Sequence, residues 1–199
     1  MKFLIFIITF FSITSTAQNT DINILKNINL NRNKNLDNTF KRISNTVAPA
    51  SIALPLLVFS YGLLKQDTTY KNKGIFIGSA LAITAVITAG LKYAVNRTRP
   101  FETFSFIDNV VDEKTASFPS GHTSFAFSTA TSFSLAFPKW YVIAPSFIWA
   151  STVAYSRMDL GVHYPSDVLV GAIIGAATSY LCIKANNCIN KREKIKDKI

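Results

Sequence analysis

The sequence predicts an all-α integral membrane protein, a bundle of about five transmembrane helices that follows an N-terminal signal peptide or an additional helix. Its 199 residues suit one domain, and only 16% of them are charged, whereas a soluble domain carries about a quarter. Nearly half of the residues are hydrophobic, and they gather in runs close to the ~20 residues that a helical span needs. No run has the two-residue period of a β-strand.

The N-terminal part of the chain divides into two segments. Residues 1–17 resemble a secretory signal peptide, because Lys2 precedes an apolar run that ends in small residues. This run is short for a span, so cleavage is favoured over retention as a first membrane helix. Residues 18–45 are polar and basic, with apolar residues at near-helical spacing. We expect this amphipathic segment either to lie on the membrane surface or to pack on the protein as a solvated helix.

The main domain is expected over residues 46–185, and a basic tail over residues 186–199. Its apolar spans are expected at residues 47–64, 74–91, 122–137, 140–155 and 168–183. The third of these is rich in Ser and Thr, which predicts a position inside the bundle. In the fifth, Gly171 and Gly175 form a face of small residues suited to close helix packing.

The positive charge indicates the kind of partner that the protein binds and the orientation of the chain in the membrane. The net charge of +10 is spread over the termini and short loops, which favours anionic lipid headgroups and phosphate substrates over nucleic acid. With five spans, the lysines of residues 65–73, the turn at 138–139 and the C-terminal tail fall on one side, which the positive-inside rule makes cytoplasmic. We therefore expect a multi-pass inner-membrane protein whose C-terminus is cytoplasmic. Residues 92–121 and 156–167 would then face the periplasm or extracytoplasmic side.

The first polar cluster on that face contains Lys92, Arg99 and Pro100. Lys92 and Arg99 are seven residues apart, close to two helical turns, so they can share one helix face and converge on an anion. The planar fork of an arginine and the point charge of a lysine both suit phosphate. Pro100 is expected to end the helix. Taken alone, the two cations could equally be basic side chains that snorkel to the membrane interface.

The second cluster is Pro119-Ser120-Gly121-His122, a turn at the start of the third span. Backbone N–H groups at a helix start bind anions, and the Ser120 hydroxyl can add to them. His122 stands where it could protonate a leaving oxygen. A histidine at a helix end is also commonly structural.

The third cluster lies in residues 156–167 and holds Arg157, His163 and Asp167. His163 and Asp167 are four residues apart, which places them on one helical face if the fifth helix begins near Tyr164. A carboxylate that fixes one ring nitrogen leaves the other as a nucleophile. A buried polar contact would use the same pair without catalysis, and a zinc site built from both histidines and Asp167 is a further alternative.

Together the three clusters resemble the three sequence motifs of the type 2 phosphatidic acid phosphatase superfamily. The matching patterns are Lys-x6-Arg-Pro, Pro-Ser-Gly-His and Ser-Arg-x5-His-x3-Asp, in the family's order and without a departure at any motif position. The resemblance implies that His163 attacks phosphorus, that Asp167 orients it and that His122 protonates the leaving oxygen. It also implies that phosphate is held, without a metal or other cofactor, by five residues: Lys92, Arg99, Ser120, Gly121 and Arg157.

The resemblance implies a membrane phosphatase that acts on a lipid phosphate or diphosphate in the bilayer. Undecaprenyl diphosphate, phosphatidylglycerol phosphate, phosphatidate and lipid A all fit, and the sequence does not choose between them or fix an oligomeric state. One alternative is a secreted acid phosphatase or vanadate haloperoxidase of the same superfamily, which the apolar spans disfavour. Another is a membrane protein that binds lipid phosphate without catalysis.

Overall fold

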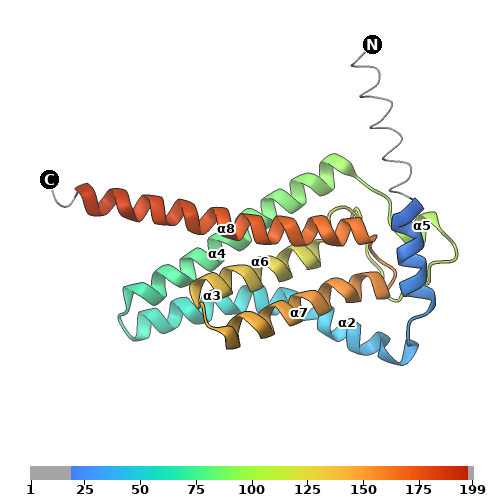
Figure 1. Cartoon of the computed structure of the whole chain (residues 1–199), viewed down its shortest axis with the longest axis horizontal. Helices are drawn as coiled ribbons and strands as arrows, with labels where there is room; N and C mark the ends of the chain where they lie inside the picture. The colour runs from blue at the N-terminus through green and yellow to red at the C-terminus, as the bar shows by residue number, and fades with distance from the viewer. Residues whose placement is uncertain (1–18, 197–199) are drawn as a thin grey trace, which may run out of the picture.

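The computed structural model of the chain describes residues 19–196, with side chains described as far as residue 186. The expected signal peptide, residues 1–17, lies outside the described residues. Within that part of the chain the ordered elements are helices, which confirms the all-α prediction. The long helices lie side by side in an elongated bundle (Figure 1).

Five helices form this bundle, one for each of the expected spans. They are α3 (Val47–Leu64), α4 (Thr68–Val95), α6 (Gly121–Ala136), α7 (Trp140–Asp159) and α8 (Pro165–Lys196). Helix α8 continues 13 residues beyond its expected end, and α4 starts six residues earlier than expected. The Asp67 side chain caps this start by accepting a 2.7 Å bond from the Thr69 backbone N–H. The expected lysine-bearing loop is therefore a short turn, and Lys71 and Lys73 lie on the helix.

Not all of these helices are apolar enough to be recognised as spans by composition. Three segments of the described chain are long and apolar enough to cross a membrane: Lys34–Leu64, Thr68–Thr103 and Pro165–Asn186. Of the two remaining helices, α6 has only 16 residues and α7 has 20, and both carry Ser and Thr residues that lower their hydropathy. The count of five spans therefore stays a prediction.

The hydroxyl groups of α6 are buried in the centre of the bundle, as its composition predicts. Ser128 and Ser132 have no exposed surface. The Thr84 hydroxyl of α4 lies 3.0 Å from that of Ser128, and the Ser179 hydroxyl of α8 lies 3.2 Å from it on another side. Ser132 donates to the Ser128 carbonyl one turn earlier, at 2.7 Å. These bonds allow Ser128 and Ser132 to be buried between helices without the cost of an unpaired donor, whereas the buried hydroxyls of Thr131 and Ser134 have no hydrogen-bond partner.

Helices α6 and α8 approach each other closely along the glycine face of α8. A Cβ atom added at Gly171 would come within 2.8 Å of the Ser120 carbonyl oxygen, and one at Gly175 would overlap the Ser124 carbonyl. Both distances are too short for a real side chain. The close packing expected from the two glycines is confirmed, and it joins the beginning of α6 to the first turns of α8.

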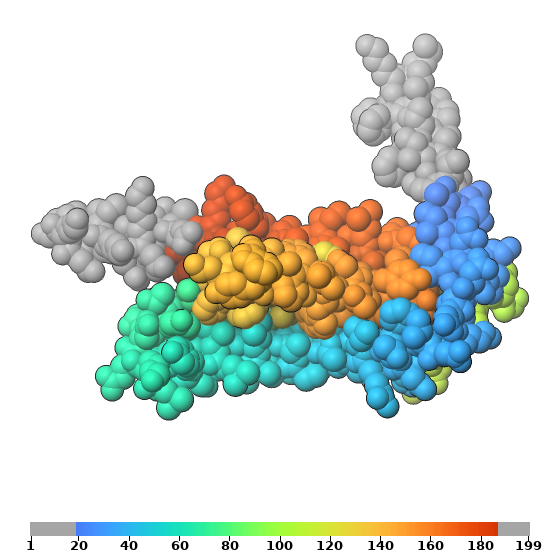
Figure 2. Space-filling view, turned by 60° about the horizontal axis from the view of Figure 1, so that its bottom comes forward, coloured from blue at the N-terminus to red at the C-terminus, as the bar shows by residue number. Residues whose placement is uncertain are grey.

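The N-terminal segment covers one end of the bundle. Residues 19–30 are helical, and the short η1 (Lys34–Leu36) and α2 (Asp37–Asn45) follow. In Figures 1 and 2 this blue segment lies at the end where the short helix α5 (Pro100–Thr103) is found. Leu25 packs with Ile107 and Tyr164. The buried Asn29 amide donates to the backbone carbonyls of Asp108 and Asp159, each at 2.9 Å. The inner face of the segment is thus packed on the protein.

Candidate active site

The first cluster is built differently from its expected form. Helix α4 ends at Val95, where Asn96 adopts the left-handed conformation with φ 44°. Arg99 caps the start of α5, and Pro100 is the first residue of that helix rather than the end of the previous one. The prediction that Lys92 and Arg99 share one helix face is therefore wrong, because the chain leaves the helix between them.

The two cations nevertheless meet at one cavity of about 380 Å³. Five of the eight expected site residues line this cavity: Lys92, Arg99, Gly121, His122 and His163. Helix α3 and Phe125 provide its apolar lining, with Val47, Ala48 and Ile52. The cavity therefore has charged and apolar parts, and the charged part gathers the three sequence clusters.

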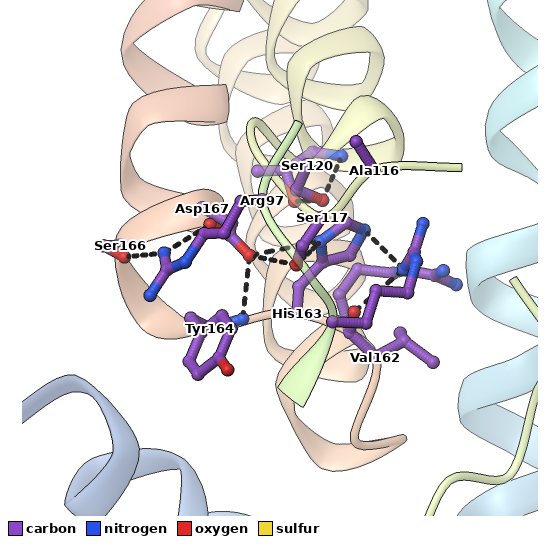
Figure 3. Close-up of polar contacts among 12 residues, drawn as sticks. Arg97, Ala116, Ser117, Ser120, Val162, His163, Tyr164, Ser166 and Asp167 are labelled. Atoms are coloured by element: carbon purple, nitrogen blue, oxygen red, sulfur yellow. Dashed lines mark hydrogen bonds and ion pairs between the residues drawn. The ribbon is translucent and has the colours of Figure 1, made fainter. Parts of the chain in front are cut away.

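His163 is deeply buried, with 1% of its surface exposed. It follows a turn in which Gly161 has a positive φ of 74°, a conformation that favours glycine. The Nδ1 atom of the ring lies 3.5 Å from Asp167 Oδ2 and 3.4 Å from Ser117 Oγ. On the other side, Nε2 lies 3.5 Å from an Nη of Arg99. Figure 3 shows the ring between these two groups of contacts.

The Asp167 carboxylate behind His163 has no exposed surface and is held by several donors. Its Oδ2 accepts a 2.5 Å bond from the Ser117 hydroxyl and a 3.0 Å bond from the Tyr164 backbone N–H. Its Oδ1 accepts a 2.7 Å bond from Arg97 (Figure 3). An ionised carboxylate in this position orients the imidazole and favours a proton on Nδ1.

A glutamate lies among the cations of the site. Arg157 donates to Oε1 of Glu113, and Arg99 lies 3.6 Å from its Oε2. The same Oε1 is 4.0 Å from Nδ1 of His122. Arg157 does not line the cavity itself, but the shared carboxylate links it to two residues that do. A second bond, 2.7 Å long, joins Arg157 to the Ser44 hydroxyl of α2.

His122 and Lys92 are held less firmly. The His122 side chain is 33% exposed, and Glu113 at 4.0 Å is its charged neighbour. The Lys92 ammonium donates to the Ala116 backbone carbonyl. Both are therefore free to change partners when a ligand enters the cavity.

Ser120 and Gly121 form the start of α6, as expected. Ser120 is the N-cap of the helix and is completely buried, and its hydroxyl lies 3.0 Å from that of Thr123. Its backbone N–H donates to the Asp167 carbonyl at 3.0 Å. Gly121 lines the cavity, whereas Ser120 lies behind it.

Burial and neighbouring charges set the ionisation of two groups in the site's loops. Burial lowers the pKa of His163 to about 3, against the opposite effect of Asp167, so the imidazole is neutral at neutral pH. For Glu113, burial opposes ionisation, but Arg157 and Arg99 outweigh it and hold the pKa below the usual value of a glutamate. Glu113 is therefore a carboxylate anion beside the cations.

Sequence reasoning missed several residues of the site. Ser44, Arg97, Thr115 and Ser117 contact expected residues, and Asp21 is joined to them through Arg97. Arg97 is a basic residue next to a motif, which is a weak signal, and Asp21 has no signal at all because it is distant in the sequence. For the zinc alternative, no three His, Cys, Asp or Glu side chains gather as a ligand set in the described part of the chain.

Comparison with known proteins decides the family. The sequence pattern of the PAP2 superfamily matches residues 73–190, which is more than half of the chain. The chain belongs to the PAP2 superfamily. Its relatives place it in the membrane lipid phosphatase branch, and the resemblance inferred from the three motifs is confirmed.

Two curated relatives illustrate the range of this branch. An undecaprenyl-diphosphatase from Sulfolobus acidocaldarius is 36% identical over 114 residues, which is 54% of this chain and 54% of that protein. A lipid A 1-phosphatase from Rhizobium etli is 31% identical over 148 residues, covering 65% of this chain and 62% of its own length. The chain thus spans between about half and three fifths of these relatives.

Two solved structures share the fold over nearly their whole length. LpxE of Aquifex aeolicus superposes with a TM-score of 0.74 at 28% identity, covering 83% of this chain and 95% of that one. A transmembrane PAP2-type phosphatidylglycerolphosphate phosphatase from Bacillus subtilis has the same TM-score and identity and covers 94% of each chain. The PAP2 protein described here is an integral membrane protein with several apolar helices.

Proposed function

We propose that this PAP2 protein is a membrane phosphatase that hydrolyses a lipid phosphate or diphosphate through a phosphohistidine on His163. The observation that carries the proposal is one cavity that both histidines line together with Lys92 and Arg99. Side chains of α3 and Phe125 make the remainder of this cavity apolar. Such a cavity suits a ligand with an anionic head and a hydrocarbon tail.

In the first chemical step, Nε2 of His163 attacks phosphorus and forms a P–N bond. The neutral ring and its Asp167 contact on Nδ1 support this role, because Nε2 then carries the lone pair. The P–O bond to the lipid breaks at the same time. His122 gives its proton to the departing oxygen, so the lipid leaves as an alcohol, or as a lipid monophosphate if the substrate is a diphosphate.

In the second step, water replaces the imidazole on phosphorus. His122, now neutral, takes a proton from the attacking water, the P–N bond breaks and inorganic phosphate is released. His163 returns to its starting form. Every proton that His122 gives in the first step is thus recovered in the second.

The phosphoryl oxygens would be held by fixed positive groups. Arg99 and Arg157 already bind the carboxylate of Glu113, which supports their ability to hold an anion at this place. Lys92 and the Gly121 backbone N–H complete the ring of donors, with Ser120 capping the helix start. An entering phosphate would take the place of the Glu113 carboxylate.

The substrate class remains wider than one lipid. The relatives act, by their names, on undecaprenyl diphosphate, lipid A or lipid phosphate. These share a phosphate on a long apolar chain, which is the part of the molecule that the cavity addresses. We include phosphatidylglycerol phosphate and phosphatidate in the same set.

The test is phosphate release by the purified full-length protein in detergent. Wild type, tested on prenyl diphosphate, phosphatidylglycerol phosphate, phosphatidate and lipid A, is expected to release phosphate from at least one, also in the presence of a strong chelator. His163→Ala should lower kcat on the order of 10³-fold or more. Acid-labile ³²P-phosphohistidine should form on wild type alone. If wild type and His163→Ala were equally inert on the whole panel, a non-catalytic lipid-phosphate binder would be the better description.

We also propose that α3, α4, α6, α7 and α8 all cross the membrane, with the site facing the extracytoplasmic side. The α3–α4 and α6–α7 turns lie at the opposite end of the bundle from α5 (Figure 1). Those turns and the C-terminal tail carry lysines, which the positive-inside rule assigns to the cytoplasm. A C-terminal fusion that fluoresces only in the cytoplasm should be bright, and a dark fusion of a stable protein would reverse the orientation.

A further inference from the structure

Arg97 contacts the centre of the site although it stands between the motif positions Lys92 and Arg99. One of its Nη atoms lies 2.7 Å from Oδ1 of Asp167 and 2.8 Å from the Ser166 hydroxyl. The other lies 2.9 Å from Oδ2 of Asp21, a residue of the N-terminal helix. Arg97 therefore bridges two carboxylates that are 146 positions apart in the sequence.

Asp21 in turn is bound to the first turn of α8. Its Oδ1 accepts a 2.8 Å bond from the Ser166 backbone N–H, and its Oδ2 accepts from the Ser166 hydroxyl. The side chain is mostly buried, with 8% exposed. The guanidinium of Arg97 also stacks 3.8 Å from the centre of the Tyr164 ring. Arg97 is thus held by Asp21 and Tyr164 as well as by Ser166 and Asp167. Figure 3 shows it beside the last three of these residues.

The two oxygens of Asp167 have different tasks. Oδ2 lies toward His163 and accepts from Ser117 and the Tyr164 backbone. Oδ1 accepts from Arg97. Rotation of the carboxylate would break contacts at both oxygens, so the bond to Arg97 helps to fix the angle at which Oδ2 meets the imidazole.

We propose that Arg97 and Asp21 are positioning residues that hold the Asp167 carboxylate in the orientation that makes His163 a nucleophile. The proposal rests on the hydrolytic function proposed above. It also assigns a part in catalysis to the N-terminal helix, because Asp21 lies outside the residues 73–190 that carry the family pattern. Neither residue touches the cavity, so both act through Asp167.

An arginine suits this position better than a lysine would. Its planar fork offers separate N–H groups to two carboxylates at once, whereas an ammonium is a single point charge. Removal of Arg97 would leave Asp21 and Asp167 buried near each other with less compensating charge. Breaking a buried ion pair by removing one partner is strongly unfavourable, so the carboxylate is expected to change its orientation or its partners.

The kinetic test compares Arg97→Gln, Arg97→Lys and Asp21→Asn with wild type on the best lipid substrate of the panel. Arg97→Gln should lower kcat about 10- to 100-fold, the usual effect of losing a residue that orients a catalytic group. Arg97→Lys should recover part of the loss, and Asp21→Asn should lose less than Arg97→Gln. Inhibition by inorganic phosphate should stay within about twofold of wild type, because the phosphate-binding residues are untouched.

Arg32→Gln provides a matched control. Arg32 also bridges two aspartates at the same end of the molecule, Asp37 at 3.1 Å and Asp108 at 2.7 Å, and its side chain is 2% exposed, against 25% for Arg97. Its hydrogen bonds go to Asn29, Asp37 and Asp108, and not to Asp167 or either histidine. Its loss is expected to lower thermal stability to a degree similar to that of Arg97→Gln and to leave kcat near wild type. Equal kcat losses in the two variants would overturn the proposal.

A second readout does not depend on activity. The chain has only two histidines, so ¹⁵N-histidine labelling gives two imidazole rings, and His122→Gln assigns them. In wild type the His163 ring should carry its proton on Nδ1, with Nε2 unprotonated. Arg97→Gln should give a mixture of tautomers, and Arg32→Gln should not. An unchanged His163 spectrum in Arg97→Gln would overturn the positioning role. If Arg97→Gln changed the tautomer but the wild type released no phosphate from any lipid, only the proposed function would be overturned.

Discussion

The two histidines of the site are held in very different ways. His163 is buried and has contacts on both ring nitrogens, with Asp167 and Ser117 near Nδ1 and Arg99 near Nε2. His122 is one third exposed, and its ring makes one ion-pair contact, with Glu113 at 4.0 Å. One ring is fixed by the protein, and the other is left for the ligand to fix.

This difference matches two chemical tasks. A nucleophile must meet phosphorus along one line, so any rotation of its ring lowers the rate. A general acid must follow an oxygen that moves away, and a group that serves as acid and then as base needs access to water. Each histidine is therefore expected to work less well when the contacts or the exposure that suit its proposed task are changed.

The largest effect is expected where the fixed ring loses its support. Asp167→Asn should lower kcat on the order of 10²- to 10⁴-fold with little change in KM, since an amide can favour the wrong tautomer of His163. Steady-state kinetics on the best substrate provides the measurement. Asp159→Asn is the matched control, because Asp159 is also buried but lies outside the site. A comparable loss in the control would indicate a structural effect.

The exposed ring should matter to a degree that depends on the leaving group. His122→Gln should lower kcat about 10²-fold for a lipid monophosphate, whose alkoxide needs a proton. The loss should be much smaller for p-nitrophenyl phosphate, whose leaving group is a weak base. His163→Ala should lose activity on both substrates alike. Equal sensitivity of His122→Gln to the two substrates would contradict the assignment of His122 as the acid.

Removal of the Glu113 charge is expected to strengthen the binding of an anion beside His122. Glu113→Gln should lower the inhibition constant of vanadate about fivefold, because the anion no longer competes with a carboxylate for Arg157 and Arg99. Asp112→Asn, a change at the exposed neighbouring residue, should have no such effect. An inhibition constant that rises in Glu113→Gln would show that the carboxylate supports the cations rather than competing with the ligand.

The smallest effect concerns acidic pH. Protonation would remove the nucleophile, but a His163 pKa of about 3 keeps about nine tenths of the ring neutral even at pH 4. The logarithm of kcat/KM for His122→Gln, measured from pH 5 to 8, should therefore show no bend from His163. A bend near pH 6.5 that the titration of the substrate's own phosphate does not explain would mean that the His163 ring is more accessible to water than its burial indicates.

The sequence identified residues that the structure brings together at one cavity, because they stand in motifs at fixed spacing, and their catalytic roles stay a proposal. His163 and Asp167 illustrate this, since a short turn holds them together whatever surrounds them. Lys92 and Arg99 show a limit, because their convergence was predicted through a shared helix face and is achieved instead by a break at Asn96. The motif thus predicted that the two cations converge, but the helical conformation assumed between them was wrong.

The supporting residues could not be found in this way. Asp21 and Ser44 reach the site only through the packing of the N-terminal segment, and no local pattern records a contact over more than a hundred positions. Glu113 lies in an irregular loop whose path depends on the arginines that bind it. Such contacts depend on the tertiary structure. A single sequence shows which residue types are present but does not show which of them come together in space.

Gly171 affects the separation of the two histidines. The histidines belong to two different parts of the bundle, His122 to the start of α6 and His163 to the turn before α8. The distance between those parts is limited by the contact of Gly171 with the Ser120 carbonyl. A residue without a side chain thus allows the starts of α6 and α8 to lie close together. A methyl group added at Gly171, 8 positions after His163, is expected to widen the separation between His163, the proposed nucleophile, and His122, the proposed acid.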